Sequence, residues 1–341
     1  MSLGSRFYRQ KGRVTMDENE LMGSMKVSKA VAKMAIPSVI SSLVTVVYNM
    51  ADTFFVGQTG DPLQVAAVSL TNPIFILFMA FANMFGMGGS AAASMALGEK
   101  KEKRVKQVSS FITYASLIVG IVFAAILLVG MQPVLQLFGA DADTYELAKG
   151  YTTYISYGAP FIIWSAAASF VVRADGASRE AMTGSMIGTV ANIILDPIFI
   201  SGFGMGAAGA AIATTIGNIM ASVYYLWYFC RKSRNMSMAF RYFKCGDRIL
   251  SQVCSAGLPT AIFSALMSIS TIILNQILVA YGNAPVAAIG IVFKANMFIT
   301  FLQMGLANGV QPLLGYSYGA GNRERFITVE RYTKKCCLIV G

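Results

Sequence analysis

Apolar residues in this chain occur in long runs that are separated by short polar segments. A helix that crosses a bilayer needs about 20 mostly apolar residues, and most of these runs reach that length. The pattern therefore predicts an all-α polytopic membrane protein with nine spans, the last of them incomplete. The expected spans are Val31–Val56, Leu63–Leu97, Val108–Phe138, Tyr151–Val172, Met182–Ile200, Ala207–Phe229, Ile249–Tyr281, Val286–Tyr318 and Phe326 to the end.

Composition supports this prediction and narrows the chemistry. Of 341 residues, 55% are hydrophobic and only 13% are charged, which excludes an ordinary soluble domain. Histidine is absent, so Ser/His/Asp triads, Cys/His pairs and histidine zinc sites are excluded. The five cysteines form no CxxC pair, and no GxxxxGK[ST] phosphate loop occurs. We expect no enzyme activity and no cofactor, with energy drawn from an ion gradient or a partner.

The basic residues indicate how the chain is oriented. Of 27 Lys and Arg residues, 25 fall in every second polar segment, and the intervening turns contain almost none. Loops rich in Lys and Arg face the cytoplasm, so the N-terminus is expected to be cytoplasmic. The net charge of +11 therefore reflects membrane topology, with membrane lipid rather than nucleic acid as the partner.

An internal repeat divides the chain. The segment from Val65 to Arg104 resembles the segment from Val286 to Arg325 without a gap, so Gly98 matches Gly319. Six spans separate the two copies, so the halves are expected to be parallel. By this period the second half stops early, and we expect a fragment that lacks roughly 100 C-terminal residues of a twelve-helix protein.

Two acids lie inside apolar runs. Asp52 falls in the first predicted span, and Asp196 falls in the fifth with Asn192 one helical turn earlier. Ionisable groups within a span typically mark an ion path, a proton relay or a structural pair. Pro197 should kink the helix beside Asp196 and free a backbone oxygen, and oxygen ligands suit a hard cation.

Other interpretations of these residues stay open. Asp52 lies near the outer end of its helix, where its carboxylate could reach water, and Asn192 and Asp196 could simply bond another helix. Lys294 lies about nine residues into a predicted span. It either lines a cavity and pairs with an acid, or it bonds carbonyl groups at a kink.

Several segments together resemble the MATE (multidrug and toxic compound extrusion) transporters, in particular the bacterial branch related to the DNA-damage-inducible proteins. The resemblance covers essentially the whole chain. It is carried by IPSVISSLVTVVYNMADTFFVGQ, the NxxxD pattern of ANIILDPIFI, GMGAAGAAIATTIGN and GLANGVQPLLGYSYGAGN.

The resemblance implies a two-lobe transporter that exports hydrophobic, often cationic compounds in exchange for Na⁺ or H⁺ by alternating access. It implies a cation site in the first lobe, with cavity residues around it. The implied cation ligands are Asp52, Asn192, Asp196 and Thr214, and the cavity tyrosine is Tyr151 or Tyr154. The seventh-helix acid of another branch is missing from Leu258–Tyr281, which favours the first-lobe site.

These inferences give a domain plan and a location. We expect a cytoplasmic tail at 1–30, a first lobe at 31–230, a basic linker at 231–248 and an incomplete second lobe at 249–341. The protein is expected to be a monomer in the bacterial plasma membrane. The alternative function is a lipid-linked oligosaccharide flippase, which should line its cavity with several basic residues. A membrane scaffold is disfavoured, because buried acids would serve no purpose in it.

Overall fold

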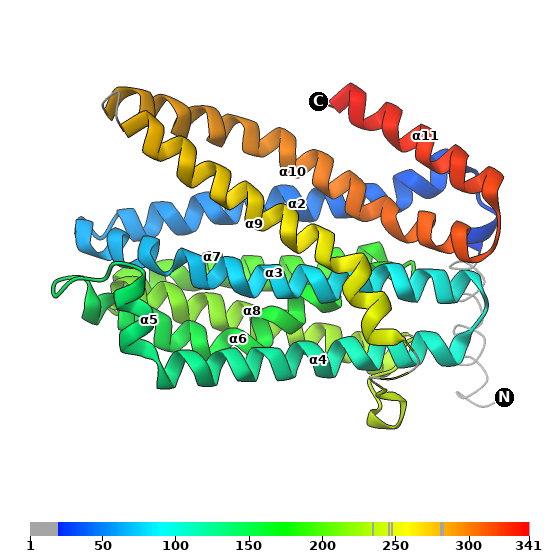
Figure 1. Ribbon diagram of the computed structural model, residues 1–341, viewed down its shortest axis with the longest axis horizontal. Helices are drawn as coiled ribbons and strands as arrows, with labels where there is room; N and C mark the ends of the chain where they lie inside the picture. Colours follow the sequence, from blue (N-terminus) through cyan, green and yellow to red (C-terminus); the bar gives the residue numbers. More distant parts are fainter. Residues whose placement is uncertain (1–19, 234, 245, 247, 280–282, 341) are drawn as a thin grey trace.

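The structure is a computed structural model. It describes residues 20–340 apart from 234, 245, 247 and 280–282, and parts of 264–295 are described by backbone alone. In the described residues the chain is a bundle of long helices joined by short turns (Figure 1). The helices are α2 (Val27–Gly57), α3 (Pro62–Gly98), α4 (Glu102–Val129), α5 (Met131–Leu137), α6 (Tyr145–Ala174), α7 (Ser178–Pro197), α8 (Gly206–Arg231), α9 (Ile249–Val279), α10 (Asn283–Gly319) and α11 (Arg323–Val340), with short helices η1 (Ile198–Gly202) and η2 (Phe240–Tyr242).

The predicted spans correspond to helices with shifted ends. Among the residues whose side chains the structure describes, six helices are long and apolar enough to cross a membrane: α2, α3, α4, α6, α7 extended by η1, and α8. The expected span Val108–Phe138 is divided, because the helix breaks at Gly130 between α4 and α5. The chain is thus a multi-pass, all-α membrane protein.

The last predicted span, from Phe326 to the end, corresponds to helix α11, which begins at Arg323. Its 18 residues include seven charged side chains. The helix packs beside α10 and α2.

One end of the bundle carries the polar connections at 99–101 and 320–322, and we call it the basic end (Figure 1, right). The opposite end carries the α2–α3 turn, which is capped where Asp61 accepts from the backbone N–H of Leu63 (3.0 Å). Pro62 is the first residue of α3. Its missing N–H costs no hydrogen bond, since the first backbone amide of a helix has no acceptor within the helix.

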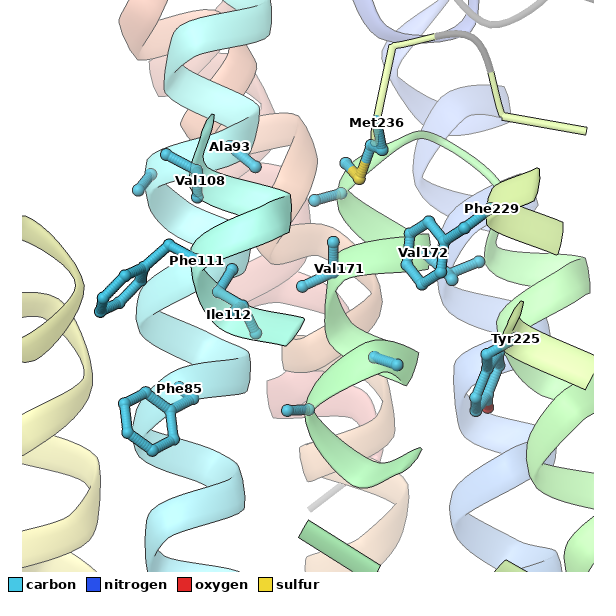
Figure 2. Packing of buried hydrophobic residues seen from close by; sticks show 14 of the residues in the cluster. Phe85, Ala93, Val108, Phe111, Ile112, Val171, Val172, Tyr225, Phe229 and Met236 are labelled. Carbon is cyan, nitrogen blue, oxygen red and sulfur yellow. The ribbon is translucent and has the colours of Figure 1, made fainter. Parts of the chain in front are cut away.

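The hydrophobic core of the first half lies between α3, α4, α6 and α8. Figure 2 shows Phe85 of α3, Phe111 and Ile112 of α4, and Val171 of α6 packed in this cluster. Small residues on α3 let the helices approach closely. A methyl group added at Gly89 would overlap the side chain of Ile112. The core therefore fixes the helices that carry the polar residues described below.

The two halves of the repeat pack symmetrically. In the first half Gly88 on α3 lies against the backbone of α9 at Val253, and in the second half Gly309 on α10 lies against α2 at Ala35. The sequence repeat places Gly88 and Gly309 at equivalent positions. Each half thus contributes its second long helix to the first helix of the other half.

Candidate ion and substrate site

Asp196 is the most buried acid of the candidate site, with 0% of its surface exposed. It occupies the last turn of α7, where Pro197 cannot donate a backbone hydrogen bond. The chain continues from there as a π-helical turn, Ile198–Gly202, in which Phe203 N–H bonds to the carbonyl oxygen of Ile198 (2.9 Å). The helix therefore changes its hydrogen-bond pattern directly after the acid, as happens at many functional sites.

Asn192 and Thr214 lie beside Asp196. The Asn192 amide is oriented with its nitrogen toward the acid. The Asn192 nitrogen then donates to Asp196 Oδ2 (2.9 Å), and the Asn192 side-chain oxygen accepts from Thr214 Oγ1 (3.1 Å). The reverse orientation would set the amide oxygen against a carboxylate oxygen. Asn192 and Asp196 therefore share one face of α7, and Thr214 meets them from α8.

The second carboxylate oxygen of Asp196 has no such partner. Oδ1 is buried and makes no hydrogen bond to any described residue. A buried carboxylate oxygen without a partner is energetically unfavourable. A bound cation or proton at this oxygen would remove that penalty.

Asp52 and two tyrosines complete the cluster. Asp52, on α2, is partly buried, and its charge acts on Asp196. Tyr48 lies one helical turn before Asp52, and its hydroxyl is 3.4 Å from Thr214 Oγ1. Tyr151 on α6 lies within electrostatic reach of both acids. Four helices of the first half, α2, α6, α7 and α8, thus converge on one polar cluster.

The other predicted cavity residues are placed differently. The Tyr154 side chain is 37% exposed, and its backbone oxygen accepts from Thr215 Oγ1 (3.0 Å). It therefore contributes to helix packing and not to the acid cluster. Lys294 lies on α10, but its side chain falls outside the described residues.

A cavity of about 380 Å³ adjoins the cluster. Asn192, Thr214 and Tyr48 form part of its wall, and α10 closes the other side with Phe301 and Met304. Aromatic and Met side chains adapt to ligands of varied shape and attract organic cations. The cavity lies between the two halves of the repeat, where many transporters bind their substrates.

A second chamber of about 270 Å³ adjoins this cavity on the side of the basic end. The two share Thr45, Asn83 and Met304, among other residues. Arg173 lines the second chamber, although it falls just after the expected span Tyr151–Val172. It lies in the last turn of α6 and is only 7% exposed.

Sequence reasoning missed Tyr48 and Arg173. The spacing of Tyr48 and Asp52 on one helix face could have indicated the first. For Arg173 no local signal exists, because the segment from Arg173 to Glu180 reads as a loop. In the structure α6 ends at Ala174, two residues after the expected end of the span, so Arg173 belongs to the helix.

Comparisons with known proteins give the family. The MatE family model matches residues 37–198 and 259–341. The multidrug export protein MepA of Staphylococcus saprophyticus is 35% identical over 292 residues, which is 86% of this chain and 65% of that protein. MepA of Staphylococcus aureus strain NCTC 8325 is 33% identical over 294 residues, with the same coverage.

Solved structures agree with this match. A crystal structure of MATE in complex with MaD3S superposes with a TM-score of 0.90 at 28% identity, and covers 95% of this chain and 72% of that one. The chain spans about 65% of the length of the curated relatives. Because the family model matches well over half of the residues, the chain belongs to the MatE family of transporters.

Proposed function

We propose that this protein exports hydrophobic, often cationic compounds in exchange for Na⁺ or H⁺, and that it does so without covalent chemistry. The observation that carries the proposal is Asp196 Oδ1, which has no hydrogen-bond partner and belongs to a side chain bonded to Asn192 in the wall of the 380 Å³ cavity. The MepA relatives are multidrug export proteins, which supports the same substrate class. The proposed site is the bacterial plasma membrane, with the basic end in the cytoplasm.

The geometry supports a coupling mechanism. Asp52 and Asp196 both carry negative charge when ionised, and their charges interact. A Na⁺ ion or a proton at this cluster neutralises the repulsion and gives Asp196 Oδ1 a partner. The cation is itself transported, in exchange for the exported compound. Its proposed ligands are Asp52, Asn192, Asp196 and Thr214.

Competition between cation and substrate follows from position. Asn192 and Thr214 belong both to the cation cluster and to the cavity wall. A cation that changes their hydrogen bonds changes the cavity, so cation and substrate favour different conformations of the carrier. The π-helical turn after Asp196 is the element that we propose repacks.

The flippase alternative fits less well. A pyrophosphate-linked substrate needs several basic residues in its cavity. The side chains that line the two chambers, as far as the structure describes them, include a single basic residue, Arg173. We therefore favour export of hydrophobic cations.

The test is ethidium efflux from vesicles that contain the protein, energised in turn by a sodium gradient and a proton gradient. We expect efflux under one gradient, and its loss in Asp52→Asn and in Asp196→Asn. Asp61→Asn is the matched control, because it makes the same change at an exposed helix cap that asparagine also satisfies. Normal efflux in Asp196→Asn would contradict the proposed site.

A further inference from the structure

Residues 236–244, in the connection between α8 and α9, are held against the side of α4. The Ser109 hydroxyl accepts from the backbone N–H of Ser237 (3.0 Å), and Tyr114 Oη donates to the backbone oxygen of Met238 (3.0 Å). In Figure 1 this connection is the yellow-green loop near α4. Helix α4 therefore determines where these residues lie on the surface of the bundle.

An aromatic cluster joins the same two elements. The ring of Tyr114 on α4 meets the rings of Phe240 and Phe243 edge-on, each with 5.4 Å between ring centroids. Phe243 also stacks on Phe111 of α4 (6.2 Å). Phe240 stacks on Phe243 (5.7 Å), yet 69% of the Phe240 surface is exposed. Packing thus holds one large apolar ring outward, where a surrounding less polar than water would stabilise it.

The exposed face of α4 indicates what that surrounding is. Beyond Tyr114 the helix presents apolar side chains, since Ile118 is 52% exposed and Ile121 is 58% exposed. In a membrane protein such a face lies against the hydrocarbon of the bilayer. Ile118 follows Tyr114 by one helical turn, which is about 6 Å along the helix axis. The ring of Phe240 therefore lies beside the end of the hydrocarbon layer, at the depth where aromatic side chains are enriched in membrane proteins.

Basic side chains adjoin this ring. Arg241 and Lys244 are both exposed. The Arg241 guanidinium lies over the Tyr242 ring (4.8 Å to its centroid), and it forms no ion pair with any residue that the structure describes. From Arg231 to Arg248 the sequence has six basic residues and one acidic residue. Cationic charge at the depth of the headgroups attracts anionic lipids, and a guanidinium matches the oxygens of a phosphate.

We propose that Phe240, Arg241 and Lys244 form a binding site for the headgroups of anionic phospholipids, which we call the η2 patch. Phe240 enters the interfacial layer of the bilayer, and the two cations bind headgroup phosphates. The η2 patch ties the connection between the two halves to one leaflet. The inference does not rest on the proposed export function, because it concerns the outer surface of the bundle and not the cavity.

The test is hydrogen exchange at residues 238–244 of the wild-type protein, in nanodiscs of phosphatidylglycerol and in nanodiscs of neutral phosphatidylcholine. We expect backbone exchange to be about fivefold slower in phosphatidylglycerol, which is the effect of one basic residue near an anionic surface. Arg241→Gln should lose most of this difference between the two lipids. Arg179→Gln is the matched control, since it removes an exposed arginine at the start of α7, at the same end of the bundle, and should leave the difference unchanged.

Soluble glycerol phosphate, added to the phosphatidylcholine nanodiscs, distinguishes a lipid site from a site for free phosphate, and we expect it to give no protection. Equal exchange in the two lipids, or protection that survives in Arg241→Gln, would overturn the proposal. Equal protection by glycerol phosphate, or an equal loss in Arg179→Gln, would overturn it as well. The experiment uses neither an exported compound nor an ion gradient, so its outcome is separate from that of the efflux test.

Discussion

Gly98 on α3 and Gly319 on α10 occupy equivalent positions in the repeat and pack reciprocally at the basic end. A methyl group at Gly98 would overlap the carbonyl oxygen of Tyr316, and one at Gly319 would overlap that of Met95. Tyr316 and Met95 are themselves equivalent in the repeat. This reciprocity is typical of a two-fold interface, and it brings the backbones of α3 and α10 into contact at the basic end.

The first prediction concerns these glycines. Gly98→Ala and Gly319→Ala should each destabilise this structure by about 1–3 kcal/mol, because the added methyl group meets backbone that cannot rotate away. Thermal unfolding in detergent measures the change. Gly57→Ala is the control, since nothing lies within 4 Å of its added methyl group. Equal midpoints for all three variants would show that the close approach is not needed for stability.

The second prediction concerns Arg325 and its repeat equivalent Arg104. Arg325 donates to the backbone oxygens of Met22 (2.9 Å) and Met25 (2.8 Å), just before α2. Arg104 donates to Gln252 Oε1 (2.8 Å), at the start of α9. Each arginine thus holds the beginning of the other half's first helix.

Replacing each arginine should loosen a different segment. In Arg325→Gln, hydrogen exchange should accelerate at residues 20–26, and in Arg104→Gln at residues 249–253, because charge-assisted bonds worth about 1.5–3 kcal/mol are lost. Each variant serves as the control for the other. Hydrogen exchange that accelerates at both segments in both variants would indicate general unfolding and not the loss of two separate local contacts.

The third prediction concerns Thr214. Thr214→Val keeps the shape of the side chain but removes the hydroxyl that contacts Asn192 and Tyr48. Affinity for the coupling cation should fall about tenfold, which corresponds to one hydrogen bond of about 1.4 kcal/mol. The measurement is the cation concentration that gives half-maximal efflux.

Thr215→Val is the matched control for this change. The neighbouring hydroxyl donates to the backbone oxygen of Tyr154 (3.0 Å), away from the acid cluster. Its removal should leave the cation dependence unchanged. If both valine variants shift the dependence equally, Thr214 has no specific part in cation binding.

The fourth prediction concerns pH. Burial raises the pKa of Asp175 above its ordinary value of 3.8, although hydrogen bonds from Ser233, Asn235 and Tyr228 oppose the shift. Between 3.8 and the raised pKa the folded protein binds a proton that the unfolded chain has released. The contribution of Asp175 to stability is therefore present below pH 3.8 and is lost as the pH rises through the folded pKa.

Asp175→Asn should remove this part of the pH dependence. The measurement is the thermal midpoint of both proteins in detergent from pH 3.5 upward. As the pH rises, the thermal midpoint of the wild-type protein should fall relative to the midpoint of the variant. A difference that stays constant with pH would show that Asp175 keeps an ordinary pKa in the fold.

The sequence by itself determined the helices, the parallel repeat and one face of the site. Runs of apolar residues longer than a bilayer crossing can only be helices in lipid, because every backbone group must be satisfied within the segment. The four-residue spacing of Asn192 and Asp196 likewise placed both side chains on one helix face.

Tertiary structure decided the rest. Which tyrosine of α6 faces the acids, Tyr151 or Tyr154, depends on how α6 is rotated against α8, and no local pattern records that rotation. The same packing buries Arg173, because a charged residue at a helix end reads as solvent-exposed until its neighbours are known. Local composition determines which segments form helices, whereas the surroundings of each polar side chain depend on residues far away in the chain.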